Sequence, residues 1–203
     1  VRTVRGEYRA RRAVITAGPW LPGLLGDTWR GRFTVRRQAL HWFAIRAAPG
    51  EFDPARFPVF IWELPGGGEP IYGFPAIDGP GGGVKVATEQ HLTETSPEGC
   101  ERAVDPTESR ALFETKVAPC FPGLSPDCVK AVTCLYTTTA GSRFVIEPHP
   151  EVPGAIVASP CSGHGFKHSA ALGEALAQLA TEGASRIDLS AFGWRPPGGE
   201  ARA

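Results

Sequence analysis

The sequence predicts an α+β fold in which an antiparallel sheet is inserted into a mixed α/β domain. Three observations predict it. The 203 residues include 25 glycines and 20 prolines, which favours many turns and short strands over a helical bundle. Segments with strand and helix patterns open and close the chain, around a central run of short polar and apolar alternations. The two longest stretches with helical spacing, residues 106–117 and 163–180, follow strands rather than one another.

Composition and charge narrow the class of protein. Hydrophobic residues make up 42% and charged residues 21% of the chain, as in soluble globular proteins. Lys and Arg (21) balance Asp and Glu (21), so no net field attracts nucleic acid or an anionic membrane. The chain contains no run of about 18 apolar residues, so the sequence predicts no membrane span. Five cysteines without a Cys-x-x-Cys pair favour neither a disulfide framework nor zinc. We expect a cytoplasmic protein without metal, nucleic-acid or membrane partners.

The first segments predict a strand and a short helix. Residues 11–16 form an apolar strand that ends in Ala17-Gly18-Pro19-Trp20. Small residues at such a place let a backbone or a ligand approach closely, so Gly18 is a candidate cofactor contact. Pro19 suits the first turn of a helix, and Gly26 would end it. The chain opens at Val1, in strand-like sequence and without Met, so we expect an N-terminal truncation.

The centre of the chain predicts the antiparallel sheet. Residues 32–46 alternate as one long strand, with a break near Gln38. Strands at 58–64 and 69–74 are joined by a hairpin at 66–68, and a turn at 79–83 leads to a strand at 84–88. A helix follows at 106–117, with Asp105 as its N-cap and Pro106 at its first position.

The last third predicts strands at 130–137, 144–146 and 155–158, then a helix that Gly163-His164-Gly165 opens and that runs to about Ala180. Glycines at a helix start free backbone N–H groups, which with the helix dipole favour negative or electron-rich ligand atoms. A plain glycine-rich turn fits this pattern equally well. The tail after Trp194 is expected to be loose.

Several polar residues allow two interpretations each. Val84 and Val86 share one face of a strand, so Lys85 points to the other, either as a solvated edge residue or as a buried cation beside a cofactor. Lys167 lies where the helix dipole opposes a cation, which suggests a grip on a substrate carboxylate, or a solvated lysine. Cys134 is either a small buried hydrophobe or a reactive thiol. Tyr72 is either a core aromatic or a pocket wall.

Taken in order, seven segments resemble the monomeric sarcosine oxidase family, which includes N-methyltryptophan oxidase and pipecolate oxidase. The more specific segments are Cys134-Leu135-Tyr136-Thr137 and Ser162-Gly163-His164-Gly165-Phe166-Lys167; the others are 13–20, 37–38, 72–75, 84–86 and 144–147. The resemblance implies oxidation of a secondary amino acid, N-methylated or cyclic, to an imine, with reduction of oxygen to hydrogen peroxide. It also implies FAD as the cofactor, and a monomer when complete.

The same resemblance implies an organisation of the chain. Residues 1–30 and 128–203 would belong to the FAD-binding domain, and residues 31–127 would form the substrate-binding antiparallel sheet. No Gly-x-Gly-x-x-Gly follows an apolar strand, so the N-terminal Rossmann segment of the family is missing. We therefore expect this chain to be the C-terminal portion of a two-domain flavoprotein oxidase, inactive when alone.

Residue roles are also implied by resemblance. Cys134 matches the cysteine that bonds to the flavin 8α-methyl group, although the residues alone leave its modification open. Lys85 matches the lysine that activates oxygen, where a positive charge would stabilise developing negative charge. Lys167 matches a ligand of the substrate carboxylate. Thr137, Gly163, His164 and Gly165 match residues around the flavin ring, and Tyr72 and Tyr136 match active-site aromatics.

One position departs from the family. Glu89 stands where sarcosine oxidases carry an active-site histidine, which puts sarcosine itself in doubt as the substrate, and His91 could partly substitute. Two other functions remain open. One is a flavin dehydrogenase that passes electrons to an acceptor other than oxygen. The other is a non-catalytic, degenerate fragment that keeps the fold.

Overall fold

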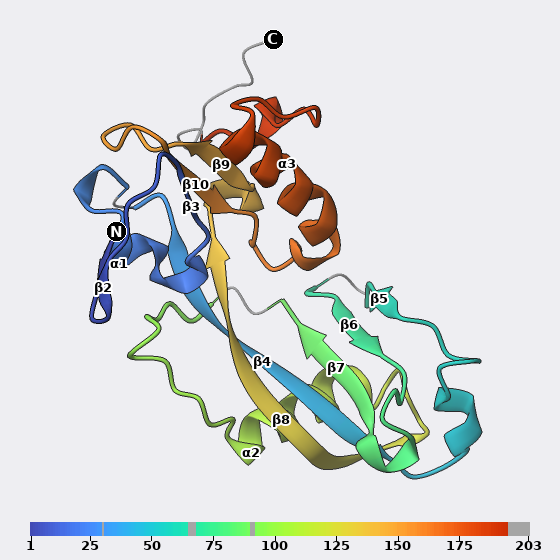
Figure 1. The fold of residues 1–203 in the computed structure, drawn as a ribbon. Helices are drawn as coiled ribbons and strands as arrows, with labels where there is room; N and C mark the ends of the chain where they lie inside the picture. Colours follow the sequence, from blue (N-terminus) through green and yellow to red (C-terminus); the bar gives the residue numbers. More distant parts are fainter. Residues whose placement is uncertain (30, 65–67, 90–91, 195–203) are drawn as a thin grey trace. The chain divides into compact units, whose positions relative to one another are not determined.

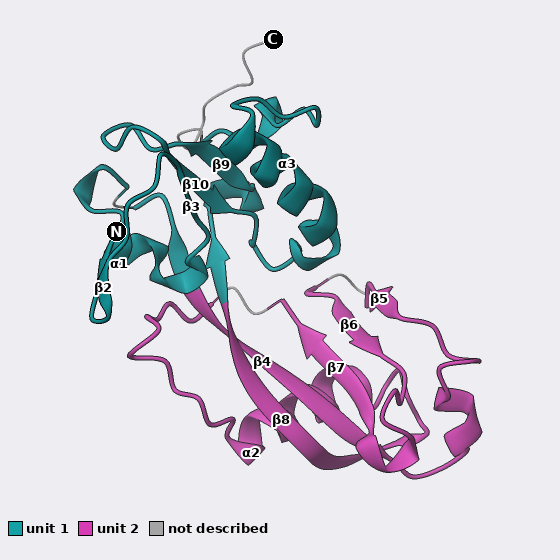
Figure 2. Ribbon diagram, viewed as in Figure 1, with its two compact units in different colours: residues 1–35, 136–203 teal, residues 36–135 magenta. Residues whose placement is uncertain are grey.

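The computed structural model describes residues 1–29, 31–64, 68–89 and 92–194 (Figure 1). The chain divides into two compact units: Val1–Val35 with Tyr136–Ala203, and Arg36–Leu135 (Figure 2). The chain leaves the first unit within strand β4 (Thr34–Ile45) and returns to it within strand β8 (Leu124–Thr138). Among the described residues, no helix is long and apolar enough to cross a membrane.

The first unit is built on a three-stranded sheet of order β3-β10-β9. Strand β10 (Ala155–Ser159) runs parallel to β3 (Ala13–Ile15) and antiparallel to β9 (Val145–Pro148). All five residues of β10 are buried, as expected for an apolar run in the middle of a sheet. A small exposed hairpin, β1 (Arg2–Thr3) and β2 (Gly6–Glu7), precedes them.

Successive residues of β9 and β10 enter two separate cores, because side chains alternate across a strand. Val145 and Val157 pack with Leu21 near the short helix α1 (Leu21–Leu24). Ile156 and Ala158 pack with Leu172 of helix α3 (Ser169–Thr181). The helix predicted after Gly18 is shorter than expected. It consists of a 3₁₀ turn, Gly18–Trp20, followed by the single α-helical turn of α1.

The final helix ends at Thr181, close to the predicted end, but it begins at Ser169 and not at Gly163. A 3₁₀ turn, Phe166–His168, precedes it. Ser162 and Gly163 have positive φ angles of 44° and 81°, which a helix cannot contain, so they form a turn instead. The glycines therefore do not supply the N-terminal N–H groups of α3, and that part of the prediction is wrong.

The second unit contains the five-stranded sheet of order β5-β6-β7-β4-β8. Strands β5 (Phe60–Trp62), β6 (Ile71–Phe74) and β7 (Val84–Thr88) are joined by antiparallel pairing, and β7 pairs antiparallel with β4. The predicted hairpin at 66–68 lies largely outside the described residues. Strand β4 is continuous through Gln38, contrary to the expected break. The Gln38 side chain is fully buried and donates to the backbone oxygens of Ala39 and Thr88.

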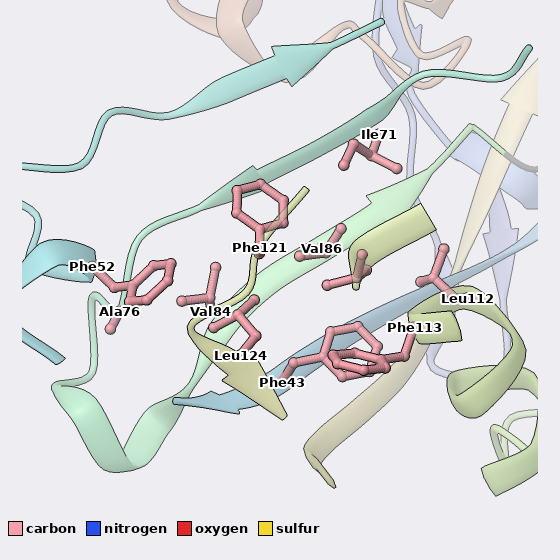
Figure 3. Close-up of a cluster of buried hydrophobic side chains, with 11 residues drawn as sticks. Phe43, Phe52, Ile71, Ala76, Val84, Val86, Leu112, Phe113, Phe121 and Leu124 are labelled. Carbon is pink, nitrogen blue, oxygen red and sulfur yellow. The ribbon is translucent and has the colours of Figure 1, made fainter. Parts of the chain in front are cut away.

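One face of this sheet is covered by helix α2 (Pro106–Leu112) and the π-helical turn Phe113–Val117. The Asp105 side chain accepts a 2.8 Å hydrogen bond from the Thr107 backbone N–H, so the predicted N-cap is confirmed. Figure 3 shows the buried side chains between sheet and helix: Phe43, Phe52, Ile71, Ala76, Val84, Val86, Leu112, Phe113, Phe121 and Leu124, with Val117 completing the cluster. The opposite face of the sheet carries the alternate residues of the same strands.

His41 lies on the covered face and gives the second unit a pH-dependent stability. It is fully buried, and its Nδ1 lies 3.0 Å from Ser109 Oγ. Burial lowers the pKa of His41 below its ordinary value of 6.5; Glu108 opposes this and Arg37 adds to it. Below pH 6.5 the unfolded chain therefore takes up a proton that the folded chain excludes, and stability falls with pH until the folded pKa is reached.

We expect the free energy of unfolding to decrease by up to about 1.4 kcal/mol per pH unit as the pH falls below 6.5. Urea denaturation at pH 7.5, 6.5 and 5.5 measures this. The decrease should be smaller in His41→Gln, which cannot titrate, and unchanged in the exposed His168→Gln. Equal slopes in wild type and His41→Gln would contradict the assignment.

Candidate functional site

The face of the second unit's sheet that lies opposite α2 carries a row of side chains centred on Lys85. Lys85 in β7 pairs directly with Trp42 in β4 on one side and with Phe74 in β6 on the other. Directly opposed residues project to the same face of an antiparallel sheet. The burial of Val84 and Val86 on the other face confirms the predicted direction of Lys85.

The aromatic rings of this row surround the Lys85 ammonium. Nζ lies 4.9 Å from the ring centroid of Phe74, 5.5 Å from that of Trp42 and 5.9 Å from that of Tyr72. Cations at such distances interact favourably with the ring quadrupole. A pocket of about 260 Å³ opens beside these side chains, and its lining includes Trp42, Phe74, Asp78 and Lys85.

Lys85 is half-buried, and this burial lowers the pKa of its ammonium group; negative charge on Cys134 opposes the decrease. Cys134 lies in β8, half-buried, four residues after Lys130. Lys130 Nζ lies 4.7 Å from the Trp42 ring, so Lys130 reaches the face that carries Lys85. The charge of Cys134 acts on the Lys85 ammonium, so Cys134 lies near it on that face. The structure thus brings Tyr72, Lys85 and Cys134 to one side of one sheet.

Strand β8 is longer than the predicted 130–137, because it begins at Leu124. Pro126 and Asp127 are turn-forming residues by pattern, which is why the sequence did not predict a strand there. In the structure β8 is the last strand of the sheet order, and an edge strand tolerates proline. Lys130, whose ammonium lies over the Trp42 ring, is the first residue of the predicted strand and lies inside the longer one.

The second group of predicted residues lies in the first unit, around a tight turn at 160–165. The Ser162 N–H donates to Thr137 O (2.9 Å), and the Thr137 N–H donates to Cys161 Sγ (3.4 Å). A Cβ on Gly163 would lie 2.8 Å from the Tyr136 ring. The end of β8 and the glycine turn are therefore packed against each other, which brings Tyr136, Thr137 and Gly163 together.

His164, Gly165 and Lys167 continue this turn. The His164 ring stacks on Phe144 with centroids 4.8 Å apart, and its Nε2 lies 3.0 Å from Ser142 O. A Cβ on Gly165 would lie 1.6 Å from Pro160 O, so only glycine fits there. Lys167 is exposed within the 3₁₀ turn that precedes α3.

Two predicted residues lie apart from these groups. Gly18 has a φ of 51°, and a Cβ there would meet nothing within 4 Å, so its requirement for glycine is conformational. Glu89 directly follows β7 and is exposed. His91 lies outside the described residues.

Sequence reasoning missed Trp42 and Ser162. By pattern, Trp42 is one apolar residue of an alternating strand, and only the strand register places it opposite Lys85. Ser162 is a buried non-glycine residue in the left-handed region. Its Oγ donates to Arg143 O at 3.2 Å, which helps to hold this conformation. No local pattern predicts either feature.

The fold and these groups define a mixed α+β protein with a glycine turn in one unit and a lysine among aromatic rings in the other. Residues 1–179 match the family described as FAD dependent oxidoreductase, and the chain belongs to this family. This confirms the family resemblance and the predicted fold class.

Two curated proteins are similar in sequence to nearly the whole of this chain. Monomeric sarcosine oxidase of Streptomyces avermitilis is 39% identical over 193 residues, which cover 95% of this chain and 50% of that protein. N-methyl-L-tryptophan oxidase of Shigella flexneri is 30% identical over 198 residues, which cover 95% and 49%. The chain therefore spans about half the length of the curated relatives it matches.

A solved structure supports the fold alone. The open form of NikD, an amino acid oxidase essential for nikkomycin biosynthesis, matches with a TM-score of 0.72 at 20% identity. The match covers 95% of this chain and 50% of that chain.

Proposed function

We propose that the protein carrying this chain oxidises a secondary amino acid, N-methylated or cyclic, to an imine and reduces oxygen to hydrogen peroxide. The substrate loses two electrons and two hydrogens from its C–N unit, and oxygen gains them. FAD, when bound, accepts the electrons from the amine and passes them to oxygen. The observation that carries the proposal is the Lys85 ammonium, held half-buried on the same sheet face as Tyr72 and Cys134.

Residues of the chain fit such a cofactor. Thr137 Oγ1 and Ser159 Oγ are buried side-chain atoms without a hydrogen-bond partner among the described residues, and buried polar atoms normally have one. Gly163 and Gly165 let this turn pack closely against Tyr136 and Pro160, which holds its backbone beside Thr137. We propose that residues 1–30 and 128–203 contribute to FAD binding and that residues 31–127 form the substrate-binding part.

Each predicted site residue has a proposed role. Cys134 bonds to the flavin, Lys85 stabilises negative charge that develops on oxygen, and Lys167 binds the substrate carboxylate. Tyr72 and Glu89 contact the substrate. The cofactor contacts are Gly18, Tyr136, Thr137, Gly163, His164, Gly165 and Lys167. The protein acts as a monomer, in the cytoplasm.

The test is made on the natural full-length protein. After acid precipitation, we expect yellow colour to remain with the protein and the intact mass to exceed that of the polypeptide by one FAD. Cys134→Ala should lose both. Cys128→Ala, a half-buried cysteine in the same strand, should keep both. A colourless protein of unmodified mass would contradict covalent attachment.

A second measurement tests the reaction. Peroxide release with a panel of N-methylated and cyclic amino acids is expected. Reduction of an artificial electron acceptor without peroxide would identify a dehydrogenase instead. A protein that binds no flavin would be a non-catalytic member of the family.

A further inference from the structure

Trp42 lies beside Lys85 in the row of side chains on the sheet face opposite α2. It lies directly opposite Lys85 on the neighbouring strand, while Phe74 lies opposite Lys85 on the other side. The ammonium is therefore flanked by one ring from β4 and one from β6. Tyr72, two residues before Phe74, adds a third ring 5.9 Å away.

Among the described residues, few charged or titratable groups lie near Lys85. Cys134 lies on β8, and its charge acts on Lys85. Lys130, also on β8, lies over the Trp42 ring. Asp78 lines the adjacent pocket. Among the described residues, Lys85 makes no ion pair within 4.0 Å and no hydrogen bond, whereas Lys116 is paired with Glu69 at 3.1 Å. Aromatic rings, and not a carboxylate, thus provide the interactions of this half-buried ammonium.

We propose that Trp42 is a positioning residue for Lys85: its indole ring holds the lysine ammonium in place and charged without neutralising it. Indole has the strongest attraction for cations among the aromatic side chains. A carboxylate at the same place would pair with the ammonium and cancel its field, whereas a ring leaves that field available to another ligand. The proposal refines the proposed function, because it states how the lysine assigned to oxygen is presented.

Lys130 supports the assignment to Trp42. Its ammonium lies 4.7 Å from the same ring, so Trp42 interacts with two cations at once. Among the described contacts, Phe74 is not shared between two cations in this way. Trp42 is half-buried within the central part of the sheet, where β4 lies between β7 and β8, so its ring has little freedom to leave this position.

The test compares Trp42→Leu, which keeps an apolar side chain but removes the ring, with Trp42→Phe, which keeps a ring. The pKa of Lys85 is measured in the natural full-length protein by NMR of ¹³C-methylated lysines, with the Lys85 signal assigned by its loss in Lys85→Arg. Trp42→Leu should lower this pKa by about half to one pH unit, because burial persists while the cation loses its ring. Trp42→Phe should restore at least half of the difference.

Trp62→Leu is the matched control. Trp62 is a partly exposed tryptophan of β5 in the same sheet, and its ring packs edge-on against Phe121 with centroids 5.5 Å apart. This variant should leave the Lys85 pKa unchanged. An unchanged pKa in Trp42→Leu, or an equal decrease in Trp62→Leu, would overturn the proposal.

The lysine titration separates this inference from the proposed function, because it needs neither substrate nor turnover. If flavin is present, Trp42→Leu should also slow flavin reoxidation by oxygen roughly two- to tenfold, with anaerobic flavin reduction unchanged. A decreased Lys85 pKa in a protein without oxidase activity would support the role of Trp42 and contradict the proposed function. Oxidase activity of the wild type, with an unchanged Lys85 pKa in Trp42→Leu, would support the proposed function and contradict the role of Trp42.

Discussion

Replacing Lys85 by methionine is expected to slow the reoxidation of reduced flavin by oxygen about 100-fold or more in the full-length protein. Oxygen acquires negative charge as it is reduced, and a fixed positive charge in a partly desolvated site stabilises that charge strongly. Lys85 meets these conditions because it is half-buried and held by three aromatic rings. Methionine keeps the length and apolar character of the side chain and removes only the charge.

Stopped-flow mixing of the reduced protein with oxygen measures this rate, and anaerobic mixing of the oxidised protein with substrate measures the other half-reaction. The second rate should change far less. Lys130→Met is the matched control, since Lys130 contacts the same Trp42 ring from an exposed position. Its reoxidation rate should stay within a few-fold of wild type. A rapid reoxidation in Lys85→Met would remove Lys85 from the oxygen chemistry.

Gly165→Ala is expected to destabilise the first unit by about 3 kcal/mol or more. Gly165 has a φ of −78° and a ψ of −23°, which alanine adopts readily, so the effect is steric. The added Cβ would lie 1.6 Å from Pro160 O and 2.6 Å from Pro160 C. These are backbone atoms, and relief requires the whole turn at 160–165 to move.

Gly173→Ala provides a control of opposite sign. Gly173 is an exposed residue inside α3, and a Cβ there meets nothing within 4 Å. Alanine should therefore stabilise the helix by about 0.5–1 kcal/mol. Urea denaturation of the two variants measures both changes. If Gly165→Ala unfolds at the same urea concentration as Gly173→Ala, the close approach to Pro160 is not a constraint in solution.

Local patterns predicted much of the fold. The period of two in Val84-Lys85-Val86 correctly placed Lys85 opposite the core, because side-chain alternation is a property of any strand. Asp105 and Pro106 correctly marked the start of α2, because capping depends on residues within one turn. The start of α3 was placed too early. Gly163 fits a helix start by pattern, but it has a φ of 81° and lies in a turn that packs against Tyr136.

The sequence by itself determined the family, the order of strands and helices, and the side of β7 on which Lys85 lies. These follow from motifs and periodicities that involve neighbouring residues only. The tertiary structure alone decided that Trp42 lies opposite Lys85, that Lys130 reaches the same ring, and that Gly165 must lack a side chain. Each depends on strand register or on close backbone approach between segments that are not neighbours in the chain, and such contacts leave no periodic signal in a single sequence.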